Sequence, residues 1–209
     1  TSVSRGLGDV YKRQGQGGIA TLFDVEQVEV FRGPQGSRTG ANALAGLIYI
    51  KTKDPTEQFE GLSEITIGDY GTQNLGIAFG GPTKNEKVKY RFVVRTDYAD
   101  GFRKNIFLNQ SDTSKKDELT IRYKLNWDIS ETTDVNFLLS KVDMDDPADI
   151  WTIDGSLNTL SDRPGMDSQE TDSVGIKLLK NFNHFDLQSF TSFTKTDVVF
   201  SYDADWGNP

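Results

Sequence analysis

The stretch VEQVEVFRGPQGSRTGANALAGLIYIKTKDP, residues 25–55, decides how the rest of the chain is interpreted. It begins with a β-rich segment, Val25 to Phe31, in which valines are interspersed with acidic and amide residues. Glycines punctuate the middle, and a second β-rich segment, Leu47 to Ile50, leads to Lys53-Asp54-Pro55. Proline cannot donate a hydrogen bond to a strand ladder, so Pro55 ends the element. The pattern therefore predicts two short strands around a glycine-rich connection, closed by a linker.

Composition limits the class of protein. The 209 residues could form one large domain or two smaller ones. There is no run of about 18 apolar residues, which excludes a transmembrane helix but not a transmembrane β-barrel, whose strands alternate in polarity. The absence of cysteine excludes a disulfide framework and a thiolate metal site. A net charge of -8 without a basic tail argues against a nucleic-acid partner and is typical of a solvated acidic surface.

Beyond Pro55 the chain alternates between polar and apolar residues in segments separated by turn residues, which predicts an antiparallel meander. The third and fourth segments are the clearest, and each is long enough for a tilted strand to cross a bilayer. A period of two sustained over such lengths is incompatible with a helix. In the last segment the alternation slips between Leu187 and Phe190, which predicts a bulge. The seven predicted strands are residues 59–68, 74–80, 87–98, 118–127, 135–143, 172–180 and 185–202.

The connections between these strands alternate in length. Those after the second, fourth and sixth strands are short, whereas those after the third and fifth are long; the first is also short. Bacterial outer-membrane barrels have short periplasmic turns and long external loops, so the asymmetry favours a barrel. The alternative is a soluble β-sandwich. The two differ in whether the apolar side chains of strands 87–98 and 118–127 face outward or lie under a second sheet.

The stretch 25–55 resembles the end of the plug domain of TonB-dependent outer-membrane receptors. The turn glycines, the Arg-Gly-Pro triplet at 32–34 and the closing Thr-Lys-Asp-Pro occur together and in the family's order. The chain is similar to this family from about Thr21 onward, with less specific likeness at Ser161–Gly165 and Phe200–Asp205. The resemblance implies an all-β fold in which a plug end precedes the first third of a barrel of about 22 strands.

The implied domain boundaries divide the chain into three parts. Residues 15–54 are expected to be the C-terminal part of the plug, and residues 55–209 the N-terminal strands of the transmembrane barrel, forming an open curved sheet. Residues 1–14 resemble the leader found on assembled environmental sequences and are expected to be non-native. The chain as a whole is expected to be an internal fragment of a longer receptor.

The resemblance also implies a function, namely active uptake of a scarce ligand, often a ferric siderophore, across the cell outer membrane. The implied partners are outer-membrane lipid, the small ligand, and the TonB complex of the inner membrane, which pulls on a short box near the start of the plug. No cofactor is expected. The alternative from another class is a soluble β-sandwich or surface adhesin domain that binds without transporting.

The glycine-rich motif supplies the first set of candidate residues. The resemblance implies that Arg32 pairs with glutamates of the barrel wall and acts as a latch, because breaking a buried ion pair costs about 3–5 kcal/mol. The alternative is that Arg32 caps a turn carbonyl. The glycines are expected to provide positive φ or close backbone approach rather than ligand contact. The complete motif is Arg32, Gly33, Pro34, Gly36, Gly40 and Gly46.

Basic side chains supply the second set, on the polar faces of the third and fourth predicted strands. If these faces line the barrel lumen, they form a basic stripe beside the plug in an otherwise acidic chain. Such a stripe could attract an anionic substrate such as a ferric siderophore, or it could pair with plug carboxylates. The stripe consists of Lys87, Lys89, Arg91, Arg95, Arg122 and Lys124.

No residue pattern indicates a metal site or an enzyme. Asp143, Asp145, Asp146 and Asp149 lack the ligand spacing and turn glycine of a calcium loop, so a solvated acidic loop at 144–170 is expected instead. His184 is the only histidine and lies in a predicted short turn. With neither a second histidine nor a nucleophile elbow, the sequence predicts no enzymatic activity.

Overall fold

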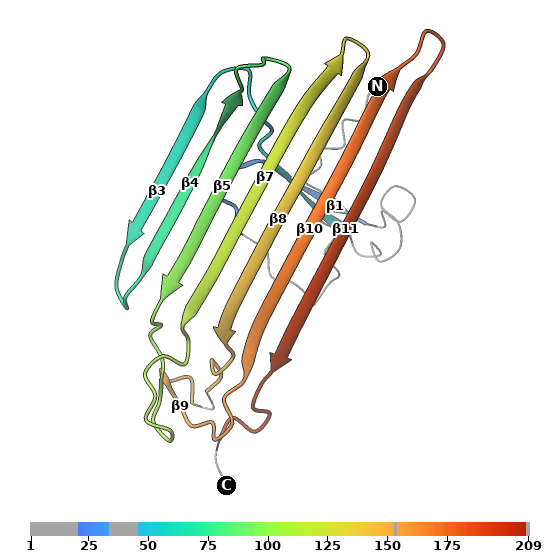
Figure 1. The fold of residues 1–209 in the computed structure, drawn as a ribbon. Coiled ribbons are helices and arrows are strands. Elements are labelled where there is room, and N and C mark those ends of the chain that lie inside the picture. The colour runs from blue at the N-terminus through green and yellow to red at the C-terminus, as the bar shows by residue number, and fades with distance from the viewer. Residues whose placement is uncertain (1–20, 34–45, 153, 208–209) are drawn as a thin grey trace.

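The computed structural model describes residues 21–33, 46–152 and 154–207, and within them every regular element is a β-strand. Seven strands form one antiparallel sheet in the order β11-β10-β8-β7-β5-β4-β3 (Figure 1). The predicted all-β meander of seven strands is thus confirmed. The strands are β3 (Glu60–Ile67), β4 (Gln73–Pro82), β5 (Val88–Ala99), β7 (Lys116–Ser130), β8 (Thr133–Pro147), β10 (Met166–Asn181) and β11 (Asp186–Ser201).

The register of the sheet places side chains of the same kind opposite one another on neighbouring strands. Arg91 of β5 lies opposite Lys124 of β7, and Phe92 lies opposite Tyr123. Because successive side chains of a strand point to opposite faces, one face of the sheet becomes polar and the other apolar. The polar face is the buried one, since Arg91, Arg95 and Lys124 are all buried.

The apolar face of the sheet remains open. Leu75, Leu139 and Val174 are exposed there, and in the part of the chain that the structure describes no second sheet covers them. A soluble sandwich needs such a cover, so the barrel interpretation of the alternation is the one that the sheet supports. None of the described residues forms a helix long and apolar enough to span a membrane.

A separate two-stranded hairpin lies against the polar face. Its strands are β1 (Val25–Arg32) and β2 (Gly46–Thr52), paired antiparallel with Val30 opposite Ile48. In Figure 1 this hairpin lies behind the seven-stranded sheet, about halfway along the strands. The small buried apolar cluster between the two parts consists of Phe23, Ala78 and Val93.

The two long loops join at one end of the sheet. The loop after β5 contains β6 (Lys104–Asn105), the loop after β8 contains β9 (Asn158–Thr159), and these two short strands pair in parallel. The side chain of Asp149 accepts hydrogen bonds from Asn105 Nδ2 at 3.0 Å and Thr159 Oγ1 at 2.7 Å. All three residues are buried, so the loops form one interlocked unit.

Two details of the predicted strands are wrong. The long loop was expected at 144–170, but β8 continues to Pro147 and β10 starts at Met166, which pairs with it. A strand extends as far as its neighbour offers ladder partners, which local polarity does not reveal. The bulge near Leu187 is absent, because β11 pairs with β10 residue by residue. A local slip in the alternation of side chains does not by itself interrupt the backbone ladder.

The expected acidic loop also needs correction. Asp145 and Asp146 belong to strand β8 rather than to a loop, as Asp143 at the end of the predicted strand does, and Asp149 is buried instead of solvated. Asp149 is held by the loop contacts described above, which lie far from it in sequence. Among the described residues, no group of acidic and histidine side chains is arranged to hold a metal ion.

Candidate functional site

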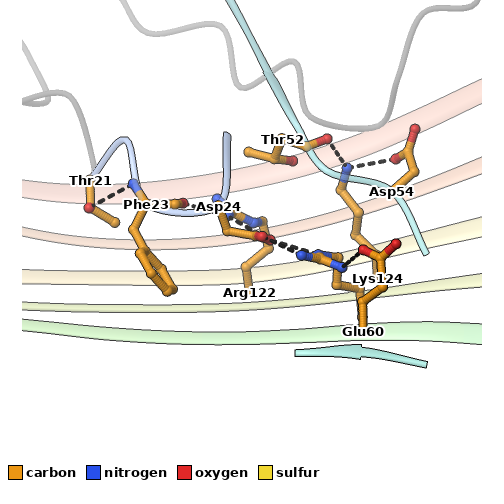
Figure 2. A network of polar contacts seen from close by, with 9 residues as sticks. Thr21, Phe23, Asp24, Thr52, Asp54, Glu60, Arg122 and Lys124 are labelled. Carbon is orange, nitrogen blue, oxygen red and sulfur yellow. Dashed lines mark hydrogen bonds and ion pairs between the residues drawn. The ribbon is translucent and has the colours of Figure 1, made fainter. Parts of the chain in front are cut away.

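The polar face of β4, β5 and β7 meets both ends of the hairpin, and this junction is the candidate site. Residues just before β1 and just after β2 contact basic side chains of the sheet (Figure 2). The amide of Lys53 also donates to the carbonyl of Asp24 at 3.1 Å, which joins the two ends of the hairpin. The hairpin is therefore attached to the sheet through both of its ends.

The first attachment is a buried ion pair between Asp24 and Arg91. Arg91 Nε donates to Asp24 Oδ2 at 2.8 Å, and Nη2 donates to the other carboxylate oxygen. This two-pronged geometry matches the guanidinium to the carboxylate. The side chains are 0% and 2% exposed for Asp24 and Arg91, respectively, so neither ion is solvated. Glu60 Oε2 lies 3.9 Å from Arg91 Nη1 as a more distant second partner.

Two further cations, both on β7, bind the two ends of the hairpin. Arg122 Nη2 donates to the Phe23 carbonyl at 3.2 Å and lies 3.9 Å from Asp24 Oδ2. Lys124 Nζ donates to the Thr52 carbonyl at 2.9 Å and to Asp54 Oδ1 at 2.7 Å (Figure 2). Arg122 therefore contacts the entry to the hairpin and Lys124 contacts its exit.

Phe23 provides the apolar part of the junction. Its ring lies against Gly76 of β4, where an added Cβ would come within 2.7 Å of a ring carbon. The Arg95 guanidinium carbon is 5.6 Å from the ring centroid, within the range of a cation–π interaction. The absence of a side chain at Gly76 thus makes room for Phe23.

The cations of the polar face fall into two groups by their partners. Arg91, Arg122 and Lys124 are held mainly by the hairpin, as described above. Arg95 instead pairs within the sheet, with Asp97 at 2.7 Å and with Glu64. Lys89 pairs with Glu57 of the linker at 2.6 Å and with Asp128 of β7 at 3.4 Å.

The predicted basic stripe thus divides into residues inside the junction and residues outside it. Lys87 is exposed in the turn between β4 and β5 and makes no ion pair with any described residue. The other five lie on the polar face. Pairing with carboxylates of the 15–54 segment, one of the two predicted roles, is seen for Arg91 with Asp24 and Lys124 with Asp54.

The glycine-rich motif lies away from the junction. Arg32 is exposed at the end of β1, and none of the described residues forms an ion pair with it. Gly33 and Gly46 have φ angles of 86° and 154°. A Cβ on Gly46 would lie 2.5 Å from the Phe31 carbonyl oxygen. Pro34, Gly36 and Gly40 lie outside the described residues, as does the expected leader at 1–14.

Sequence reasoning missed several residues of the junction. Phe23, Asp24 and Gly76 were not singled out, and Asp54 was noted only as a domain boundary. One signal could have found the two aspartates. A basic stripe on a face that becomes buried requires counter-charges, and these aspartates flank the predicted hairpin.

Known proteins resemble this chain in sequence and in fold. No protein-family model matches the chain. The vitamin B12 transporter BtuB of Vibrio vulnificus is 27% identical in an alignment of 154 positions, which covers 68% of this chain and 25% of the transporter. The chain therefore spans about a quarter of that protein's length.

Two solved structures share the fold. The ferric yersiniabactin uptake receptor FyuA from Yersinia pestis gives a TM-score of 0.76 at 17% identity, over 87% of this chain and 30% of the receptor. The ferripyoverdine receptor of the outer membrane of Pseudomonas aeruginosa gives a TM-score of 0.65 at 21% identity. That match covers 90% of this chain and 26% of the receptor. These matches show that the chain has the fold of part of such receptors, in agreement with the resemblance to TonB-dependent receptors inferred from the sequence. The matched proteins are transporters and receptors rather than enzymes.

Proposed function

We propose that the chain is the plug–barrel junction of a TonB-dependent receptor that takes up a small ligand, a ferric siderophore or similar iron complex, across the outer membrane. Residues 15–54 form the end of the plug and residues 55–209 the first strands of the barrel. The receptor has no enzymatic activity in this proposal. The energy for uptake comes from the TonB complex of the inner membrane.

One observation carries the proposal: the sheet buries its charges under the chain's own hairpin and leaves its apolar face open. Arg91 is 2% exposed, whereas Leu139 on the opposite face is 51% exposed. In water this arrangement would leave a large apolar surface uncovered. In a bilayer it is the expected one, with lipid on the apolar face and a plug on the other.

The height of the apolar face fits a membrane. On β7 the apolar side runs from Trp127 through alternate residues to Leu119. These eight steps span about 27 Å along the strand at roughly 3.3–3.4 Å per residue, which is about 19–22 Å in height at a tilt of about 35–45° and approaches the apolar band of about 25 Å in outer-membrane barrels. On the same face of the neighbouring strands, charged residues begin beside Ile121: Lys141 is paired with Ile121 and with Asp172, and Asp172 with Lys195.

The junction suggests how the plug is held and released. With Asp24 paired to Arg91, the entry to the hairpin is bonded to the wall, and the bond resists outward movement of the plug. Separating such a buried pair costs about 3–5 kcal/mol if one partner is left unpaired. A pull transmitted along the plug from TonB would reach Phe23 and Asp24 before it reaches the β1–β2 pairing, so these contacts would break first.

In this proposal the two long loops, which follow β5 and β8, capture the ligand. Trp151 stacks on Trp206 with ring centroids 5.8 Å apart, and both rings remain partly exposed. Ser161 Oγ donates to Asp203 Oδ2 at 2.6 Å, which ties the segment after β11 to the loop after β8. A rigid aromatic surface of this kind can bind a ligand with little loss of conformational entropy.

Uptake of a labelled ferric siderophore by cells that produce the full-length receptor tests the function. Accumulation should depend on the receptor and stop in cells that lack TonB. A panel of iron complexes and vitamin B12 would identify the ligand class. Binding to the cell surface without TonB-dependent accumulation of any of them would contradict transport and favour an adhesin.

A further inference from the structure

The three cations that hold the hairpin have little else to pair with. Among the described residues, the hydrogen bonds and ion pairs of Arg122 end on Phe23 and Asp24. Those of Lys124 end on Thr52 and Asp54. Arg91 has one partner in the sheet, Glu60, at 3.9 Å. The hairpin therefore supplies the close partners that these cations lack within the described part of the sheet.

Other cations of the same face behave differently. Arg95 pairs with Asp97 on its own strand and with Glu64 on β3, two strands away, so neither of these partners belongs to the hairpin. Arg122 and Lys124 have no such carboxylate within the described part of the sheet, since their hydrogen bonds and ion pairs end on residues of the hairpin and its two ends. The strand positions next to Arg122 are Val93 on β5 and Ser140 on β8.

Removal of the hairpin would change the charge of this face. If Phe23, Asp24 and Thr52 moved away, Arg122 would keep no partner, Arg91 would keep Glu60, and Lys124 would keep Asp54. The side chains of Glu60 and Asp54 are 52% and 43% exposed, so their charges are largely screened by solvent. Three cations would then line the opened passage beside two weakly coupled carboxylates.

We infer that Arg91, Arg122 and Lys124 have a second role, in which they form a cationic strip that guides an anionic ligand once the hairpin has left. The inference rests on the proposed function and adds the charge class of its ligand. The same side chains then act twice. They bind plug carboxyl and carbonyl oxygens in the closed state, and they attract the oxygen atoms of an anionic iron complex in the open state.

The physical basis is a fixed cationic field in a narrow passage. Charges of one sign along a cleft raise the local concentration of the opposite ion by about 10-fold to 1000-fold. The field is screened over about 8 Å at physiological ionic strength, so it acts within the width of a passage and fades at high salt. Neutral or cationic molecules of the same size gain nothing from it.

Ion selectivity of the opened receptor tests the strip without requiring the natural ligand. The full-length receptor is reconstituted in planar bilayers. Urea is then added on the side from which the plug is reached, so that the hairpin is displaced and the passage opens. The reversal potential under a potassium chloride gradient then reports which ion passes more easily. We expect chloride to be preferred, and the preference to fall by about threefold or more in Arg122→Gln/Lys124→Gln. Equal passage of both ions, or an unchanged potential in the variant, would overturn the inference.

Two matched variants distinguish the effect of the charge of the strip from a general effect of substitution on the barrel. Lys195→Gln removes the same charge from the outward face of β11 and should leave the potential unchanged. Arg122→Lys retains the charge and should retain the chloride preference. Heat-modifiable migration in gels shows whether each barrel is folded. If the double variant does not fold, the single Arg122→Gln is measured in its place.

A second measurement uses the absence of cysteine from the chain. Thr120 lies on the polar face opposite Arg95, so Thr120→Cys places one thiol beside the strip. In energised cells an anionic thiol reagent should react faster than a cationic reagent of equal size, and equal rates would refute the strip. Uptake without this preference removes only the strip, whereas the preference without any TonB-dependent uptake removes only the proposed function.

Discussion

Asp24→Asn is the sharpest test of how the hairpin is held. Asp24 has a φ angle of 59°, a conformation that asparagine tolerates well, so the substitution removes the charge without adding backbone strain. It leaves Arg91 buried beside a neutral amide, with Glu60 3.9 Å away. Removing one partner of a buried ion pair costs about 3–5 kcal/mol. Because about 1.4 kcal/mol is a factor of ten, local opening should become about a hundredfold or more easier.

Hydrogen–deuterium exchange of the full-length receptor measures this opening. Amides of β1 and β2 should exchange about a hundredfold faster in Asp24→Asn, while those of β8 and β10, which are held by their pairing with each other, should keep their rates. Glu26→Gln is the matched control, because Glu26 pairs with Lys51 on an exposed side of the hairpin at 2.8 Å. Exposed pairs contribute about 0–1 kcal/mol, so exchange in this control should change little.

A double variant separates the ion pair from general damage. Asp24→Asn/Arg91→Leu removes the unpaired cation as well, and replacing both partners of a buried pair costs much less than removing one. Exchange of the hairpin in the double variant should therefore be slower than in Asp24→Asn. The reasoning fails if Asp24→Asn leaves the exchange of β1 and β2 unchanged, or if the double variant exchanges faster than the single one.

Three further outcomes are expected. Gly76→Ala should loosen the hairpin by about 1–3 kcal/mol, seen as faster exchange, because the new Cβ collides with Phe23; Phe23→Leu should relieve part of the effect. Asn105→Ala should speed proteolysis of both long loops, because it leaves a buried carboxylate short of a donor at a cost of about 1–3 kcal/mol. The Ser161 hydroxyl lowers the pKa of Asp203, so this contact is present above the ordinary pKa of aspartate and lost as pH falls through the lowered value. Ser161→Ala removes this contact and should raise the pH at which Asp203 titrates, measured by tryptophan fluorescence, and an unchanged midpoint would contradict the assignment.

The sheet was predictable because the pattern that specifies each strand lies within the strand's own residues. In residues 88–99 the alternation of apolar and charged side chains reports both the strand and its two faces, and the predicted segment 87–98 differs from β5 by one residue at each end. Turn residues between the segments place the short connections in the same way. Where the alternation was weak, as in β11, a bulge was predicted that the paired register excludes. A slip in alternation can mark a bulge, but whether the ladder is interrupted depends on the pairing with the neighbouring strand.

The loops show where local information ends. Strand β8 runs to Pro147 through three aspartates because β10 and β7 offer backbone partners beside it, and backbone pairing is indifferent to side-chain charge. Asp149 is buried because Asn105 and Thr159 come to it from two different loops. Neither contact has a signature within the residues around Asp149.

By itself, the sequence determined the all-β meander, the hairpin at 25–52, the division of strands into a charged and an apolar face, and the likeness to TonB-dependent receptors. Only the tertiary structure decided which charges meet. Asp24 and Arg91 are 67 residues apart, and they pair because the hairpin rests on the polar face where Gly76 leaves room for Phe23. A period of two reveals which side of a strand a residue occupies. It cannot reveal which distant segment will cover that side, because that depends on the shape and charge of both surfaces at once.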